Sequence, residues 1–193
     1  MREAIRAELT AAAMRSIDEV GFAATTAGAI AASVGVTERT FFRYFPTKED
    51  AVLQPIEALG PSIAEELRRR PAAETPARAL RAAFAVAVDS VTADPVTMAT
   101  VMRLNRNEPA LRGRHLQQQD LWVTALAAAL GERLGLPADS PRSRLQCGLM
   151  MLAWEKALTS CYEAGDFTRA GDELDAALEE SRAFLQVAPL TGR

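Results

Sequence analysis

The apolar positions near the N-terminus recur every three or four residues, with polar side chains between them. Over residues 2–20 this spacing places one apolar stripe along a helix, and Gly21 ends the pattern. The stripe consists of Ile5, Leu9, Ala12, Ala13, Ile17 and Val20. We therefore expect a first helix whose apolar side covers the core formed by the segments that follow it.

Residues 25–48 encode two short helices joined by a tight turn. Thr26 is a good N-cap for the first helix, because its hydroxyl can accept a hydrogen bond from an unpaired backbone N–H. Gly35 suits the positive φ that follows a helix C-terminus, and Thr37 can cap the second helix. This arrangement predicts a helix-turn-helix, which indicates binding to DNA.

Proline and glycine divide the remaining chain into further helical segments. Lys48 begins a fourth helix that Pro55 can kink and Gly60-Pro61 interrupts. Further helices are expected at residues 62–70, 76–92, 95–105, 109–134, 140–164 and 170–187. The pattern predicts an all-α fold of about nine helices. A three-helix helix-turn-helix domain at residues 1–47 would precede a C-terminal bundle at residues 48–193.

Composition adds little evidence for DNA binding. The 193 residues carry a net charge of −3, and residues 1–54 contain six basic and seven acidic side chains. The prediction of DNA binding therefore rests on the helix-turn-helix pattern. With few phosphate contacts in each subunit, useful affinity requires two subunits on one duplex, because the electrostatic contribution grows with each neutralised phosphate.

Three other sequence features limit the class of protein. No apolar run approaches the ~20 residues of a membrane span, and no signal peptide precedes the first helix, so we expect a cytoplasmic protein. Cys147 and Cys161 lie fourteen residues apart on one expected helix, a separation of ~21 Å that excludes an internal disulfide. Free, buried thiols are expected, with a redox sensor as the alternative. His115 is the only histidine, and no metal-ligand spacing accompanies it, so we expect neither a metal nor a cofactor.

The segment from Ala4 to Leu53 resembles the TetR family of transcriptional regulators. The matching positions are Gly21-Phe22, Thr26, Ile30-Ala31, Gly35-Val36, Thr40, Phe45 and Lys48. The resemblance implies that Thr26, Tyr44 and Lys48 contact DNA phosphates. It also implies that the exposed start of the recognition helix consists of Thr37, Glu38, Arg39 and Thr40.

Two positions depart from the pattern of that family. Phe42 stands where a tyrosine is frequent, so a phosphate hydrogen bond is lost, although the ring can pack against a sugar or a thymine methyl group. Gly28 replaces a longer polar residue and removes a further contact. Arg39 becomes the leading base reader, because a guanidinium can span O6 and N7 of guanine. Glu38 either accepts from cytosine N4 or stabilises the helix start, and the second reading is favoured.

The family also pairs its last two helices into a four-helix dimer interface. Here these segments carry many apolar residues, namely Leu145, Leu149, Leu152, Ala153, Leu158, Leu174, Ala177, Leu178, Phe184 and Leu185. We therefore expect a homodimer. Its twofold symmetry would present two recognition helices to successive major grooves, ~34–36 Å apart, so a near-palindromic operator follows.

Beyond residue 75 the chain resembles, less sharply, regulatory domains that bind acyl-CoA-like ligands, including mycofactocin-system regulators. The matching residues are Arg103-Leu104, Glu108 to Arg112, Leu116, Trp122, Leu126 and Gly135 to Pro137. The resemblance implies a pocket within the bundle. Its candidate residues are Met98, Met102, Arg103, His115, Trp122, Met150, Met151 and Trp154.

Each candidate pocket residue has a simpler reading. Methionine and tryptophan at helical spacing are more often plain core than ligand contacts. The basic cluster can recognise phosphate at a pocket mouth, form a solvated face or steady the DNA-binding domain. This cluster comprises Arg103, Arg106, Arg112 and Arg114.

The leading hypothesis is a dimeric repressor that releases its operator when a hydrophobic or acyl-CoA-like effector binds. Release requires that the ligand prefer a conformation whose recognition helices no longer match the groove spacing. A DNA-binding regulator without an inducer is the first alternative. An all-α enzyme with a helix-turn-helix appendage is the second, and no nucleophile, phosphate loop or metal spacing supports it. We therefore expect no enzymatic activity.

Overall fold

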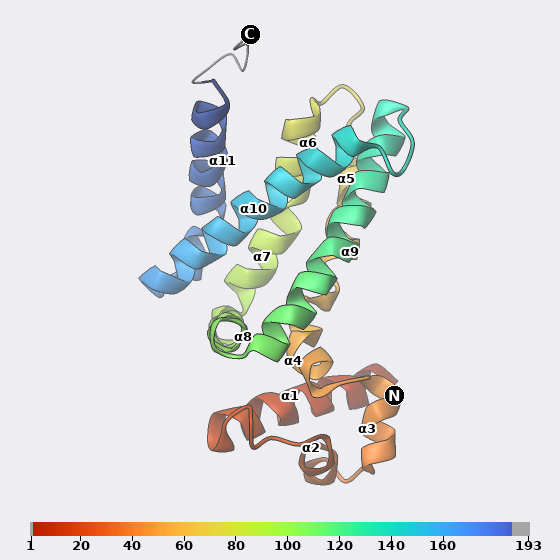
Figure 1. Ribbon diagram of the computed structural model, residues 1–193, viewed down its shortest axis with the longest axis vertical. Coiled ribbons are helices and arrows are strands. Elements are labelled where there is room, and N and C mark those ends of the chain that lie inside the picture. The colour runs from red at the N-terminus through yellow and green to blue at the C-terminus, as the bar shows by residue number, and fades with distance from the viewer. Residues whose placement is uncertain (1, 187–193) are drawn as a thin grey trace. The chain divides into compact units, whose positions relative to one another are not determined.

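The computed structural model describes the backbone of residues 2–186 and the side chains of residues 2–184. The described backbone is helical throughout apart from its turns and loops (Figure 1). The helices of the N-terminal part are α1 (Arg2–Val20), α2 (Ala27–Ser33), α3 (Glu38–Tyr44) and α4 (Lys48–Glu57). The next are α5 (Leu59–Arg69), α6 (Pro76–Ala83), α7 (Ala85–Ala93) and α8 (Pro95–Asn107). The last are α9 (Pro109–Leu134), α10 (Pro141–Ala164), the 3-10 helix Phe167–Arg169 and α11 (Ala170–Gln186). The predicted all-α class is confirmed.

The described residues form two compact units. The first unit contains the residues up to 58 together with residues 103–118, and the second contains residues 59–102 and those from 119 onwards. The division between units therefore falls inside α8 and inside α9. The predicted end of a separable DNA-binding domain at residue 47 stays a prediction.

The core of the first unit joins α1, α2, α3 and the start of α4. Its buried members are Leu9, Ala12, Ala13, Ile30, Ala31, Phe41, Phe45 and Ala51. The apolar stripe predicted on α1 supplies much of this core, as its helical spacing requires. Val20 is the exception, since it is exposed at the last position of α1, next to the turn at Gly21.

The second unit packs α10 against α11, and α5, α6 and α7 against one another. Phe84 and Trp154 meet edge to face with ring centroids 5.9 Å apart, which fixes two large side chains in its interior. Cys147 and Cys161 are both buried and free, as predicted. Burial raises the pKa of the Cys147 thiol to about 12, so this thiol stays protonated at neutral pH.

Two predicted helix boundaries were wrong. The break after α4 lies at Ala58, and Gly60-Pro61 lies in the first turn of α5. Proline is tolerated there because the first N–H groups of a helix have no intrahelical partner. The single helix expected over residues 76–92 is divided at Phe84, a fully buried side chain that ends α6 and precedes α7. None of the helices in the described part of the chain could cross a membrane, since each lacks the necessary apolar length.

Candidate DNA-binding interface

The first helix of the motif, α2, begins and ends as its sequence predicts. The Thr26 hydroxyl accepts a hydrogen bond from the Ala29 N–H at 3.1 Å. After α2 the chain turns at Gly35, whose φ is +73°, and the Val36 N–H donates to the Ala31 carbonyl. The turn therefore satisfies one of the last carbonyls of α2 before the second helix starts.

The recognition helix α3 is anchored by aromatic side chains. Its N-cap Thr37 accepts from the Thr40 N–H at 3.2 Å, and the two threonine hydroxyls lie 3.0 Å apart. Phe41 and Phe45 are buried, with ring centroids 5.7 Å apart. Phe41 lies within α3 and Phe45 is its C-cap, so the side of α3 that carries Phe41 faces the core and the opposite side is turned outwards.

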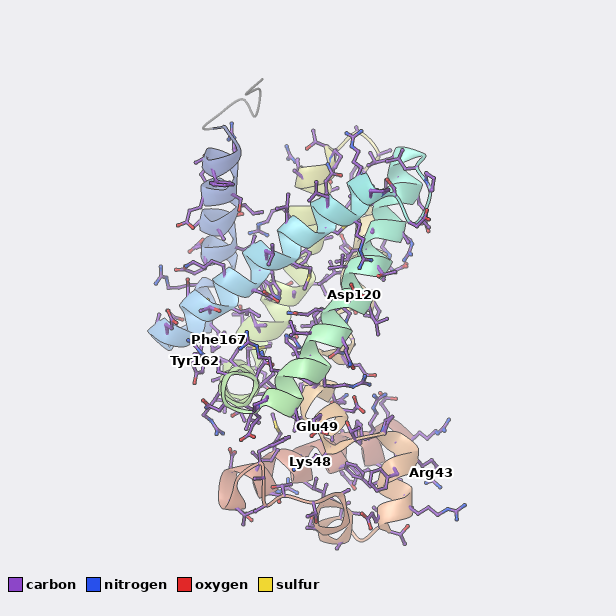
Figure 2. The ribbon with its side chains drawn as sticks, in the orientation of Figure 1. Arg43, Lys48, Glu49, Asp120, Tyr162 and Phe167 are labelled. Atoms are coloured by element: carbon purple, nitrogen blue, oxygen red, sulfur yellow. The ribbon has the colours of Figure 1, made fainter. Side chains whose placement is uncertain are left out.

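The outward face of α3 presents a ring and two guanidinium groups. Phe42 is 49% exposed, and its ring meets Phe41 edge to face at 5.5 Å. Arg39 is exposed, and Arg43 lies one turn further along α3, also exposed (Figure 2). We did not predict Arg43 as a DNA contact, although its spacing of four residues from Arg39 places the two arginines on one helix face.

The start of α3 also approaches α2. A Cβ atom added to Gly28 would lie 3.7 Å from the carboxylate of Glu38. The missing side chain at Gly28 therefore leaves room for Glu38 to lie along α2. This placement supports the helix-stabilising reading of Glu38, because a carboxylate in the first turn of α3 interacts favourably with the helix dipole.

Two other predicted phosphate ligands make contacts within the protein. Tyr44 is partly buried and packs against the core of the first unit, with the guanidinium of Arg43 5.3 Å from its ring centre. The Lys48 ammonium donates to the carbonyls of Phe22, at 2.7 Å, and Thr25, at 3.1 Å. It also lies 4.2 Å from the ring centre of Phe22. Lys48 thus joins the start of α4 to the loop between α1 and α2.

The candidate effector residues are divided between the two units. Met98, Met102, Trp122, Met150, Met151 and Trp154 belong to the second unit, where all but the half-buried Met102 are buried. Arg103 and His115 belong to the first unit. Arg103 donates to Asp18 of α1 at 3.0 Å, and burial lowers the pKa of His115 to about 4. The apolar candidates thus belong to one compact unit, and their assignment to an effector pocket stays a prediction.

Among the described residues, histidine, cysteine and carboxylate side chains form no group of three that could hold a metal ion. The geometry at α2 and α3 instead offers exposed arginine, threonine and phenylalanine side chains on two capped helices that pack against each other. These are groups that contact phosphates and base edges.

Two family models match the chain. Residues 9–54 match the bacterial regulatory proteins of the tetR family, and residues 74–186 match the MftR C-terminal domain. The HTH-type transcriptional regulator TcmR of Streptomyces glaucescens is 33% identical over 125 residues, which is 62% of this chain. The matched region spans about half of TcmR, 55% of its length.

Solved structures with the same fold include two ligand complexes. Thermus thermophilus FadR with lauroyl-CoA is 24% identical, covers 97% of this chain and 98% of its own, and has a TM-score of 0.60. The SmeT–triclosan complex is 20% identical, with coverage of 92% and 91% and a TM-score of 0.61. The matches to its N-terminal and C-terminal parts show that this chain belongs to the tetR family of bacterial regulatory proteins, with an MftR-type C-terminal domain.

Proposed function

We propose that this protein is a transcriptional repressor that leaves a near-palindromic operator when a hydrophobic, acyl-CoA-like molecule binds its C-terminal helices. The observation that carries the proposal is the outward face of α3. It exposes Arg39, Phe42 and Arg43, while the buried rings of Phe41 and Phe45 hold the helix in place. A side chain that reads DNA must be both accessible and fixed, and this arrangement meets both requirements.

Arg39 is the proposed base reader. It lies in the first turn of α3, the part of a recognition helix that reaches base edges in the major groove. A bidentate contact to guanine contributes about 1–3 kcal/mol of discrimination against other bases. Phe42 would contact a sugar or a thymine methyl group. Arg43 would add a further contact to the backbone or to a base one turn away.

Phosphate contacts are assigned to the ends of the helices. Thr26, Thr37 and Thr40 carry hydroxyls at the starts of α2 and α3, and Tyr44 ends α3. Lys48 gives two hydrogen bonds to carbonyls of its own unit. Since an ammonium group has three N–H donors, the third could serve a phosphate. Lys48 would therefore act mainly by holding the motif together.

Dimerisation is proposed through α10 and α11. Leu145, Leu149 and Leu152 recur at helical spacing along α10 and are exposed, and Phe184 is 81% exposed on α11. Such an apolar stripe is expected to pair with a copy of itself, because burial against a partner removes it from water. A twofold dimer places two copies of α3 on one side of a DNA duplex.

The apolar interior of the second unit supports the effector class. Met98, Met150 and Met151 provide flexible, polarisable thioethers that can adapt to an irregular apolar ligand. FadR of Thermus thermophilus binds lauroyl-CoA and SmeT binds triclosan in the solved complexes. Both ligands carry a large apolar part. We therefore propose a hydrophobic effector, with acyl-CoA thioesters as the first class to examine.

The proposal is tested by selecting DNA duplexes from a random pool with the purified protein. We expect enrichment of a palindromic sequence and its release by one member of an acyl-CoA series. Failure to enrich any sequence would overturn the assignment as a DNA-binding regulator. Enrichment without release by any member would leave a DNA-binding regulator that has no acyl-CoA inducer.

The role of Arg39 is tested with Arg39→Ala and a matched control, Arg15→Ala, which removes the same charge from an exposed position on α1. Arg39→Ala should weaken binding to the selected operator by about 10- to 100-fold and binding to random DNA far less. Arg15→Ala should retain the operator preference. Equal losses on operator and random DNA in Arg39→Ala would rule out base reading.

A further inference from the structure

The end of α8 and the first part of α9, residues 103–118, belong to the same compact unit as the DNA-binding helices. This segment is called the α8–α9 connection below. Residues 103–118 pack with the N-terminal residues up to 58, and two arginines there pair with carboxylates of N-terminal helices. Arg103 donates to Asp18 of α1 at 3.0 Å, and Arg114 donates to Asp50 of α4 at 2.5 Å. Both pairs tie this connection to helices that support the recognition motif.

Asp50 uses its two carboxylate oxygens for different purposes. Oδ2 accepts from the backbone N–H and from the hydroxyl of Thr47, at 3.1 and 2.9 Å, which closes a capping box at the start of α4. Oδ1 accepts from Nε of Arg114. The Asp50 side chain is only 16% exposed, so these protein groups replace most of the water around its carboxylate. One carboxylate therefore starts α4 and joins it to α9.

The start of α4 is in turn connected to the DNA-binding helices. Lys48, the first residue of α4, donates to the carbonyls of Phe22 and Thr25. Thr25 immediately precedes Thr26, the N-cap of α2. A rotation of the first turn of α4 would therefore displace the loop from which α2 begins. Arg114 is therefore linked to that loop in two steps, first through Asp50 and then through Lys48 in the same turn of α4.

We infer that Arg114 is a positioning residue for DNA binding, a role that rests on the proposed function. Its guanidinium holds Asp50, and Asp50 holds the first turn of α4 against the loop that starts α2. A direct phosphate contact is the competing role for an arginine in this region. Nε of Arg114 is committed to Asp50 and Nη1 donates to Gln117, so the observed geometry favours positioning.

Arg114→Met keeps the aliphatic stem and removes every donor, and Arg112→Met is the matched control on the same helix. Arg114→Met should weaken operator binding by about two- to tenfold, because the first turn of α4 then spends part of its time outside the arrangement that binds DNA. The dependence of affinity on salt concentration should be unchanged, because no phosphate contact is lost. Arg114→Gln should recover part of the affinity, since the glutamine amide nitrogen occupies the place of Nε. Arg112→Met should bind as the wild type does.

A double-mutant cycle identifies the partner. Asp50→Asn retains an oxygen for the Thr47 cap but loses the charge that faces Arg114. Arg114→Met should have little further effect when added to Asp50→Asn, because the two residues act as a pair. Additive losses, wild-type affinity in Arg114→Met or a weaker salt dependence would each overturn the positioning role.

Amide hydrogen exchange tests the inference without DNA. In Arg114→Met, exchange in α2, α3 and the first turn of α4 should become faster, while α10 should be unchanged. Wild-type exchange rates in those segments would refute the inference whatever the protein binds. If the wild type enriches no operator, the proposed function fails while this experiment still decides the role of Arg114.

Discussion

A Cβ atom added to Gly60 would lie 2.1 Å from Cδ1 of Trp122. Gly60 is buried in the first turn of α5, and Trp122 is a buried residue of α9. The glycine therefore lets the flat side of an indole lie directly against the backbone of a helix. No larger residue at position 60 could preserve this contact, because real Cβ atoms do not approach other heavy atoms so closely.

Gly60→Ala should therefore destabilise the protein. Alanine normally favours a helix over glycine by about 1 kcal/mol, but here the added methyl group must displace a rigid, buried ring. We expect a net loss of roughly 1–3 kcal/mol in the free energy of unfolding, together with a change in tryptophan fluorescence. Urea denaturation followed by fluorescence measures both.

Gly113→Ala is the matched control, since a Cβ atom at this helical position meets nothing within 4 Å. This variant should be stabilised by about 0.5–1 kcal/mol. A Gly60→Ala protein that is as stable as Gly113→Ala would contradict the close packing of Trp122.

Gly60 also shows which features of the fold can be predicted from the sequence and which cannot. The composition of Gly60-Pro61 predicts an interruption, yet both residues lie in the first turn of α5. Local propensity identifies residues that disfavour a helix interior, but it cannot reveal that a tryptophan 62 positions later needs the space above Gly60. In contrast, the caps at Thr26 and Thr37 depend only on neighbouring residues, and both were predicted correctly.

The candidate site shows the same division between local and distant information. The exposure of Arg39 and Phe42 follows from the periodicity of one short helix. The pairing of Arg103 with Asp18 joins residues 85 positions apart, and no local pattern indicates it. The resemblance beyond residue 75 had implied an effector pocket at Arg103, and the structure shows its guanidinium paired with Asp18 within the first unit.

Lys48→Ala should lower both stability and DNA affinity. The substitution removes two hydrogen bonds and leaves the carbonyls of Phe22 and Thr25 without this partner, a loss of about 1–3 kcal/mol. The loss should appear in urea denaturation without DNA. Affinity for operator and for random DNA should fall together, with a flatter salt dependence if the remaining N–H contacts a phosphate.

Lys48→Arg provides the comparison, because it keeps the charge but changes the donor geometry at the two carbonyls. It should retain the salt dependence of the wild type while losing part of the stability. An unchanged free energy of unfolding in Lys48→Ala would show that the two hydrogen bonds to carbonyls do not stabilise the first unit.

Leu152→Glu should dissociate the proposed dimer. Leu152 is 62% exposed on α10, so the change should leave the fold of one subunit intact. In a twofold dimer each substitution acts twice, and two buried leucines are worth about 3 kcal/mol or more. The dissociation constant should rise by about 100-fold or more, as measured by sedimentation equilibrium.

Val96→Glu is the control for Leu152→Glu, because Val96 is an exposed apolar residue on α8, away from the α10 stripe. It should leave the dissociation constant unchanged. A Leu152→Glu protein with wild-type assembly would exclude α10 as the centre of the dimer interface.

His115 should titrate far below the ordinary range of histidine. Burial lowers its pKa from 6.5 to about 4, because the charged imidazolium loses solvation. Between these two values the unfolded chain binds a proton that the folded chain does not. The contribution of His115 to stability is therefore complete above pH 6.5 and is lost as the pH falls towards 4.

This titration can be followed without ambiguity because His115 is the only histidine. The imidazole C–H signal in proton NMR should show a midpoint near 4 in the folded protein. His115→Gln should reduce the fall in stability between pH 6.5 and 5, a range above the titration of most carboxylates, so the difference between the two proteins isolates the histidine. A midpoint near 6.5 would mean that the imidazole is solvated, and the acid sensitivity would then have to come from other groups.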